Sequence, residues 1–140
     1  MTKKFLLLFL MSLVAGCETM GQMGGGAPPP CGTHVCRVQI TVTGSCSFSA
    51  NPYYLPIAAE NKNMVIQWDL TGATFTSEQD GIFIKDPYPK GEFHGFARAG
   101  GGNTFTIVNT HSVVGKPYRY GVRVIQNGTL CPAYDPTIMN

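Results

Sequence analysis

The chain has 140 residues, of which only 13% are charged, with ten Lys and Arg against eight Asp and Glu. Two of the ten basic residues, Lys3 and Lys4, stand at the amino terminus, so the rest of the chain carries equal numbers of each sign. Nucleic-acid binding requires a basic face, and we therefore expect no nucleic-acid partner. The abundance of Thr, Val, Tyr and Gly favours β-structure.

The first segment is typical of a secretory signal peptide. Lys3 and Lys4 precede an apolar run over 5–14, which ends at the small residues Ala15 and Gly16. The run is too short to span a hydrocarbon core, which needs about 20 apolar residues. We therefore predict a signal peptide over residues 1–16.

The residues Val14-Ala15-Gly16-Cys17 resemble the lipobox of bacterial lipoproteins. The resemblance implies that the chain is cut before Cys17, that the thiol is diacylated, and that the new amino group carries a further acyl chain such as palmitate. Three acyl chains would hold the protein firmly, because each buried methylene contributes about 0.8 kcal/mol. In such lipoproteins an Asp after the cysteine retains the protein at the inner membrane. Glu18 stands there instead, which favours the outer membrane of the cell envelope.

The next segment is predicted to be a linker. Gly24 to Gly26 are flexible, whereas Pro28 to Pro30 prefer an extended polyproline II conformation. We expect a lipidated cysteine and linker over 17–34. Residues 35–140 then form one β domain, large enough to bury a modest core.

The cysteines predict a disulfide framework. With Cys17 acylated, four remain in an oxidising compartment, and four cysteines allow three pairings. We favour Cys46–Cys131, which would close a loop of about 85 residues, and Cys31–Cys36, which would be a local staple. The alternative for Cys31 and Cys36 is half of a metal site, but no second Cys or His pair has a matching spacing.

Period-two alternation predicts a sequence of short strands. Trp68, within the strongest alternating run, is expected at the centre of the core, and Pro52 and Pro56 restrict their segment to a sheet edge. No helical period follows residue 17. The fold class expected is all-β, an antiparallel Greek-key β-sandwich of seven to eight strands. The predicted strands cover 38–43, 51–59, 64–70, a short piece at Phe75, 81–85, 104–109 and 118–126.

Three stretches, 64–70, 81–84 and 115–122, resemble strands of cupredoxin-like sandwiches, which share their general architecture with immunoglobulin-like domains. In blue-copper proteins a Tyr-x-Tyr/Phe-x-Cys run delivers the thiolate ligand, and a His follows it. Here Tyr118 and Tyr120 lead to Val122, and no His follows. Because a blue-copper site needs two imidazoles and a thiolate, we expect the frame without a metal or any other cofactor.

The remaining polar residues give weak signals for chemistry. His34, His94 and His111 fall in or beside separate predicted loops, and we expect all three on the surface. His94 and His111 leave open an unusual metal site, so that a copper-related or redox protein is the alternative function. His111 and Ser112 are adjacent, which is not the geometry of a catalytic triad. We therefore expect no enzyme.

Residues 86–103 are predicted to be a long Gly- and Pro-rich loop with room for one short strand. This loop is the candidate binding segment, because aromatic and Arg side chains suit contact with a protein or a glycan. The simpler interpretation, which we favour, is that Phe93 and Phe96 cover one end of the sandwich. The function expected is a membrane-anchored binding or structural module. The candidate residues are Tyr88, Phe93, His94, Phe96 and Arg98.

Overall fold

A computed structural model describes residues 28–140. The predictions for the signal peptide, for Cys17 and for most of the linker lie outside the described residues. Within them the chain forms twelve β-strands, against the seven to eight predicted, and one 3₁₀ turn, η1, with no α-helix. The additional strands are short pieces such as β5, β11 and β12. None of the described residues forms a helix long and apolar enough to cross a membrane. The elements are β1 (Val35–Thr43), β2 (Ser47–Asn51), β3 (Tyr54–Pro56), β4 (Met64–Thr71), β5 (Thr74–Phe75), β6 (Ile82–Ile84), β7 (Phe93–Ala99), η1 (Gly100–Gly102), β8 (Thr104–Asn109), β9 (Pro117–Val122), β10 (Val124–Gln126), β11 (Thr129–Leu130) and β12 (Thr137–Met139).

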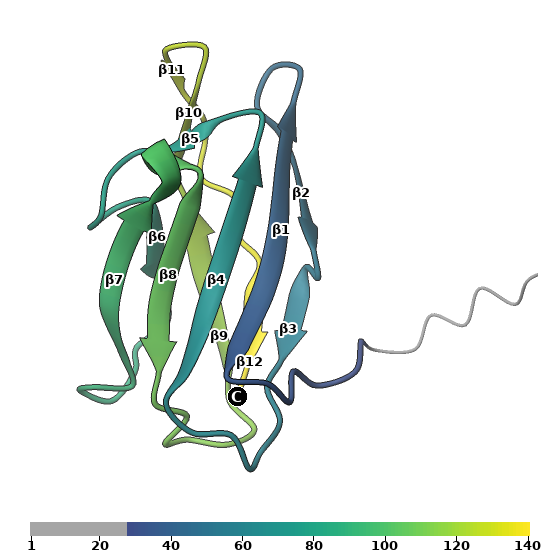
Figure 1. The fold of residues 1–140 in the computed structure, drawn as a ribbon, viewed down its shortest axis with the longest axis vertical. Coiled ribbons are helices and arrows are strands. Elements are labelled where there is room, and N and C mark those ends of the chain that lie inside the picture. Colours follow the sequence, from purple (N-terminus) through teal and green to yellow (C-terminus); the bar gives the residue numbers. More distant parts are fainter. Residues whose placement is uncertain (1–27) are drawn as a thin grey trace, which may run out of the picture.

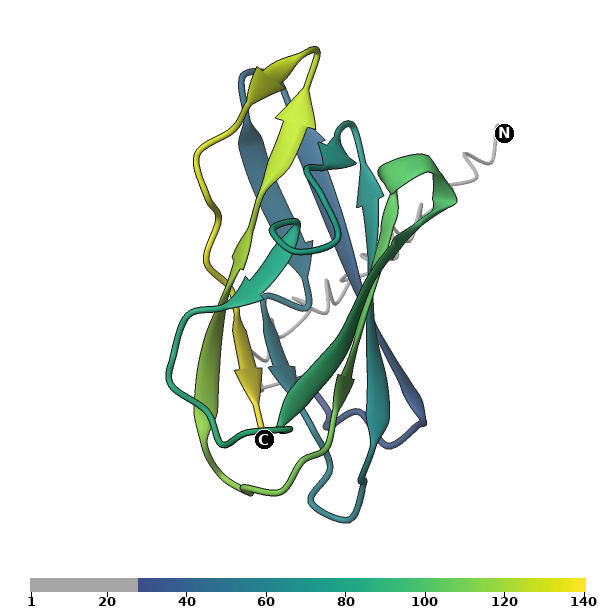
Figure 2. The same ribbon diagram turned by 90° about the vertical axis from the view of Figure 1, so that its left-hand side faces the viewer.

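The strands lie in two facing layers (Figures 1 and 2). One layer is a five-stranded sheet in the order β2-β1-β4-β8-β7. The other contains a four-stranded sheet, β3-β12-β9-β6, and β10 continues beyond β9 into a small sheet of order β11-β10-β5. Strands β6 and β7 are therefore the last strands of their sheets, and both lie on the left side of Figure 1.

The sheets are mixed, which corrects the prediction of antiparallel pairing throughout. Strand β1 pairs with β4 in parallel, and β3 pairs with β12 in parallel. Parallel neighbours need a long connection between them, and the chain between β1 and β4 supplies it by forming β2 and β3 on the way. Alternation of apolar residues is the same in both pairings, so the sequence pattern carried no information about direction.

The core lies between the two layers and follows the predicted alternation. Trp68 is fully buried, as predicted, and its ring centroid lies 5.2 Å from that of Tyr120 in the facing layer. Phe75 and Phe105 pack edge to face at 5.4 Å. Cross-layer aromatic contacts of this kind bury large apolar areas and set the spacing of the sheets. The buried residues alternate along β1 (Cys36, Val38, Ile40, Val42) and β4 (Met64, Ile66, Trp68, Leu70).

Both expected disulfides are present in the structure. Cys31 and Cys36 staple the turn that leads into β1, with a Cα–Cα distance of 5.9 Å. Cys46 lies in the turn between β1 and β2, and its partner Cys131 follows β11, with a Cα–Cα distance of 5.4 Å. The second disulfide therefore joins the two layers at one end of the molecule.

The segment 86–103, predicted as a loop with room for one short strand, contains a longer strand than expected. Residues Phe93–Ala99 form β7, a seven-residue edge strand paired with β8, and Gly100–Gly102 form η1. Glycine lowers strand propensity and hid this strand from the sequence pattern, but pairing with a neighbouring strand overrides propensity. The predicted edge position of 51–59 is confirmed, because β3 is the outer strand of its sheet.

Candidate functional site

A hollow opens on the side of the molecule where β6 and β7 end their sheets. Its volume is about 350 Å³. Figure 2 shows this side of the molecule, with β6 and β7 in front. We call this feature the aromatic hollow, because three of its lining residues are aromatic. It is lined by Glu78, Gln79, Phe83, Ile84, Tyr88 and Phe96.

Phe83 is held in place by a glycine and an arginine. It stands opposite Gly121 in the register of β6 and β9. A Cβ on residue 121 would come within 2.1 Å of the Phe83 ring, so only glycine lets the ring lie against the backbone of β9. The guanidinium of Arg123 covers the ring at 4.5 Å from its centroid and also pairs with Asp80 at 3.6 Å. The ring is therefore a fixed wall of the hollow.

Phe96 reaches the hollow because β7 contains a bulge. The register with β8 shifts between His94 and Ala97, and Gly95 has a φ of +64°. A bulge inserts a residue and re-aims the side chain beside it, and glycine adopts this positive φ without strain. Phe96 is half-buried, with its ring 6.5 Å from that of Phe105.

Tyr88 stands on a segment that is anchored at its start. Asp86 accepts hydrogen bonds from the backbone N–H and the side-chain Nη2 of Arg119, both at 2.6 Å. These bonds, the side-chain one first, lower the pKa of Asp86 to about 2. The Tyr88 ring packs edge to face on Phe93 at 5.2 Å and remains 38% exposed. An anchored aromatic ring is thus presented to solvent.

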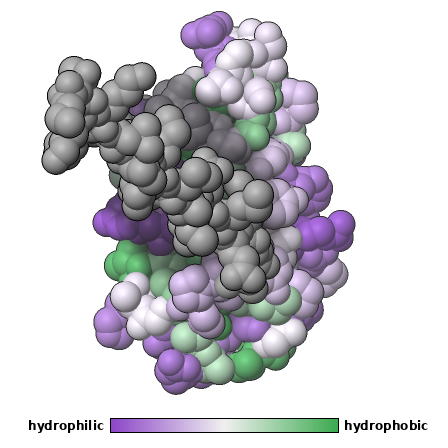
Figure 3. Space-filling model, turned by 90° about the vertical axis from the view of Figure 1, so that its right-hand side faces the viewer, coloured by the Kyte–Doolittle hydropathy of each residue, from purple (hydrophilic) through white to green (hydrophobic). Residues whose placement is uncertain are grey.

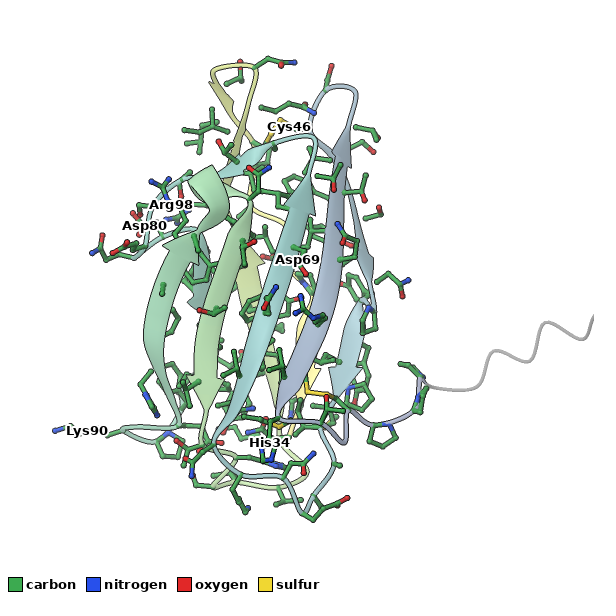
Figure 4. All side chains as sticks on the ribbon, viewed as in Figure 1. His34, Cys46, Asp69, Asp80, Lys90 and Arg98 are labelled. Atoms are coloured by element: carbon green, nitrogen blue, oxygen red, sulfur yellow. A yellow bond between two sulfur atoms is a disulfide. The ribbon has the colours of Figure 1, made fainter. Side chains whose placement is uncertain are left out.

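Glu78 is the only charged residue in the lining of the hollow. It is exposed and takes part in none of the four ion pairs found within residues 28–140. Two nearby cations are engaged elsewhere: Lys85 pairs with Asp135, and Arg98 donates to the carbonyls of Phe75 and Thr76. Lys90 lies toward the other end of the molecule (Figure 4). Figure 4 labels Asp80 and Arg98 at this corner of the molecule, near the connection between β5 and β6.

The structure brings together two of the five candidate residues from the predicted binding loop. Tyr88 and Phe96 line the aromatic hollow. Phe93 is 4% exposed and packs on Tyr118 at 5.0 Å, so it belongs to the core, as the simpler interpretation held. His94 and Arg98 are exposed on β7 and are not part of the lining.

Four lining residues escaped the sequence analysis: Glu78, Gln79, Phe83 and Ile84. Phe83 and Ile84 were included only in a predicted strand, and Glu78 and Gln79 fall in the turn before it, where no binding residue was predicted. The one signal that could have found Phe83 is the glycine that faces it. That signal depends on the pairing of β6 with β9 across about forty residues, which no local pattern reveals.

A polar cluster lies between the start of β7, the end of β8 and the end of β12. Its buried members are Glu92, Asn109, His111 and Asn140, and the exposed Ser112 joins them from the surface. The Glu92 carboxylate is 1% exposed and accepts hydrogen bonds from the Ser112 backbone N–H at 3.0 Å, from the Ser112 hydroxyl, and from the Asn140 amide at 2.6 Å. Asn109 in turn donates to Asn140 at 2.7 Å. These bonds tie three segments of the chain together.

The prediction that His111 lies on the surface is wrong. His111 is fully buried, and its Nδ1 donates to the carbonyl of Asn61 at 2.7 Å. Its backbone has a φ of +54°, and its N–H donates to Asn109 at 2.9 Å, which turns the side chain inward. The Ser112 hydroxyl is bonded to Glu92 and not to the adjacent imidazole, so the pair is part of the framework of this end of the domain.

Burial also changes the pKa values of the two tyrosines in β9. Desolvation raises the pKa of Tyr118, and the nearby charge of Glu92 adds to the effect. Burial raises the pKa of Tyr120 as well. Both side chains are fully buried and belong to the core that supports the hollow. Among residues 28–140, no group of three or more His, Cys, Asp or Glu side chains could hold a metal ion.

A second hollow of about 340 Å³ lies beside Cys46 of the Cys46–Cys131 disulfide. Its lining comes from two turns and offers one large apolar side chain, Leu130. Figure 3 shows the side of the molecule opposite the aromatic hollow, where hydrophilic and hydrophobic residues are interspersed over the visible surface. The aromatic hollow is therefore the strongest candidate for recognition. No protein-family model and no curated protein sequence matches the chain.

Proposed function

We propose that this chain is a lipid-anchored, non-catalytic domain of the bacterial envelope that binds a partner protein through the aromatic hollow. The observation that carries the proposal is the set of rings from Phe83, Tyr88 and Phe96 around one open hollow. Rigid aromatic side chains are enriched where proteins bind each other, because they bury large areas at a low cost in conformational entropy. The volume of about 350 Å³ suits the side chains of a partner.

The way in which the rings are held supports binding over simple packing. Phe83 depends on Gly121, and Phe96 depends on the bulge at Gly95. In both cases the backbone at a glycine keeps an apolar ring at the surface, although burial of the ring would be more favourable. Apart from the Tyr88 hydroxyl, only Glu78 and Gln79 add polar groups from side chains to the lining. This composition favours a protein over a glycan, whose many hydroxyl groups need more hydrogen-bonding partners.

For the frame we propose a cupredoxin-like Greek-key sandwich, in line with the resemblance of 64–70, 81–84 and 115–122. The two-layered arrangement around Trp68 and Tyr120 supports this assignment. Val122, where the blue-copper pattern has its cysteine, is buried in the apolar core. In a domain of this type the sandwich would hold the residues of the aromatic hollow in place at its edge. It would not serve electron transfer.

Site-specific photo-crosslinking in cells tests the proposed function. With p-benzoylphenylalanine at position 88 we expect one discrete crosslinked product, because the ring at this position faces a bound partner. The matched control is the same group in place of Tyr53, an exposed tyrosine that precedes β3, the outer strand of the four-stranded sheet away from β6. We expect no product of the same mass there. The same product from both positions, or none from position 88, contradicts the proposal.

A further inference from the structure

We propose that the partner places the guanidinium of an arginine in the aromatic hollow, between its rings and the carboxylate of Glu78. This inference rests on the proposed function and adds the chemistry of the group that is bound. It follows from the charge of the lining, from the rings, and from a similar arrangement that the chain already contains beside the hollow.

The lining favours a cation. Glu78 contributes a negative charge, and no Lys or Arg is among the six lining residues. Tyr88 and Phe96 add aromatic rings, whose faces attract cations. The nearby Arg98, Arg123 and Lys85 already have partners, and Lys90 lies toward the other end of the molecule (Figure 4). None of the four ion pairs among the described residues includes Glu78. An incoming cation would meet both a carboxylate and aromatic rings.

Next to the hollow, the chain already contains an arginine held between an aromatic ring and a carboxylate. Arg123 stacks on Phe83 at 4.5 Å and pairs with Asp80 at 3.6 Å. A guanidinium thus lies between an aromatic ring and a carboxylate on the outer face of the same sheet edge. Tyr88, Phe96 and Glu78 present the same two kinds of group to the outside, without an internal arginine among them.

A guanidinium fits this set better than an ammonium. It is planar, stacks on aromatic rings, and can donate two parallel hydrogen bonds to one carboxylate. Arginine is also enriched at the centres of protein interfaces, whereas lysine is depleted there. The hollow is open to solvent, so a single arginine would bind weakly alone and would add to the contacts of a larger interface.

Chemical-shift titration of the purified full-length protein tests this inference. The probes are N-acetyl-arginine amide and N-acetyl-citrulline amide, which have the same shape but differ in charge. We expect arginine to shift the signals of residues that line the hollow and to bind about fivefold more tightly than citrulline. The Glu78→Gln variant should remove most of this preference. Glu60→Gln, which changes an exposed carboxylate in the turn before β4, should leave it unchanged.

Three results would overturn the inference: equal binding of arginine and citrulline, a lysine amide that binds as tightly as arginine, or shifts that avoid the lining residues. Failure of this inference is separable from failure of the proposed function. A crosslink from position 88 with no arginine preference keeps the binding surface and removes the guanidinium. Loss of the crosslink removes the proposed function itself.

Discussion

Replacing both Cys46 and Cys131 with alanine should lower the free energy of unfolding by about 4.5 kcal/mol. The two residues are 85 positions apart, and a cross-link over a loop of this length removes much of the entropy of the unfolded chain. The loss is a large share of the total stability of a small domain, which is typically about 5–15 kcal/mol. Urea unfolding followed by the fluorescence of the single, buried Trp68 measures it.

The second disulfide is the matched control for this experiment. Cys31 and Cys36 are five positions apart, and the same relation gives about 2 kcal/mol for their replacement. The Cys46–Cys131 loss should be the larger of the two, because this disulfide closes the much longer loop. Equal losses, or a larger loss from the Cys31–Cys36 pair, would contradict the assignment of Cys46–Cys131 as the main covalent constraint between the layers.

Glu92→Ala should destabilise the domain by about 3 kcal/mol or more, although Glu92 lies outside the hollow. The substitution removes the acceptor of the Ser112 N–H, the Ser112 hydroxyl and the Asn140 amide. The Asn140 amide is buried, and a buried donor without a partner costs about 1–3 kcal/mol, whereas water can partly replace the acceptor for the exposed Ser112. The change leaves a small cavity as well. Thermal and urea unfolding of the variant provide the measurement.

Two further variants test whether the loss of stability in Glu92→Ala comes from the hydrogen bonds of this carboxylate. Glu92→Gln keeps an acceptor of similar shape without the charge, so its loss should be clearly smaller than that of alanine. Glu60→Ala removes an exposed carboxylate and should change stability by no more than about 0.5 kcal/mol. A Glu92→Ala variant as stable as Glu60→Ala would show that the polar cluster does not hold this end of the domain together.

The strands with strong alternation could be predicted from the sequence, because one buried face imposes a period of two. Trp68 followed from its place in the strongest run. The cysteine count predicted two disulfides, but it left three pairings open, of which the structure contains the favoured one. The parallel pairings could not be predicted, since alternation does not depend on strand direction. Strand β7 was hidden by its glycine, and β12 is only three residues long.

The candidate site could be predicted only in part, because some of its residues are positioned by contacts with distant parts of the chain. Tyr88 and Phe96 stood out because aromatic residues are conspicuous in a Gly- and Pro-rich segment. Phe83 did not, because its exposure depends on Gly121 in a strand distant along the chain. The burial of His111 likewise results from a local positive φ and from contacts with Asn61 and Asn109. Such contacts are made only in the folded state.

Whether the aromatic hollow meets envelope partners depends on Cys17, which lies outside the described residues. Mass spectrometry of the amino-terminal peptide of the protein, recovered from fractionated cells, tests this most directly. We predict that the chain begins at an acylated Cys17 and is found with the membranes, and that Cys17→Ser is not retained there. A soluble protein with residues 1–16 intact and a free thiol on Cys17 would contradict the account.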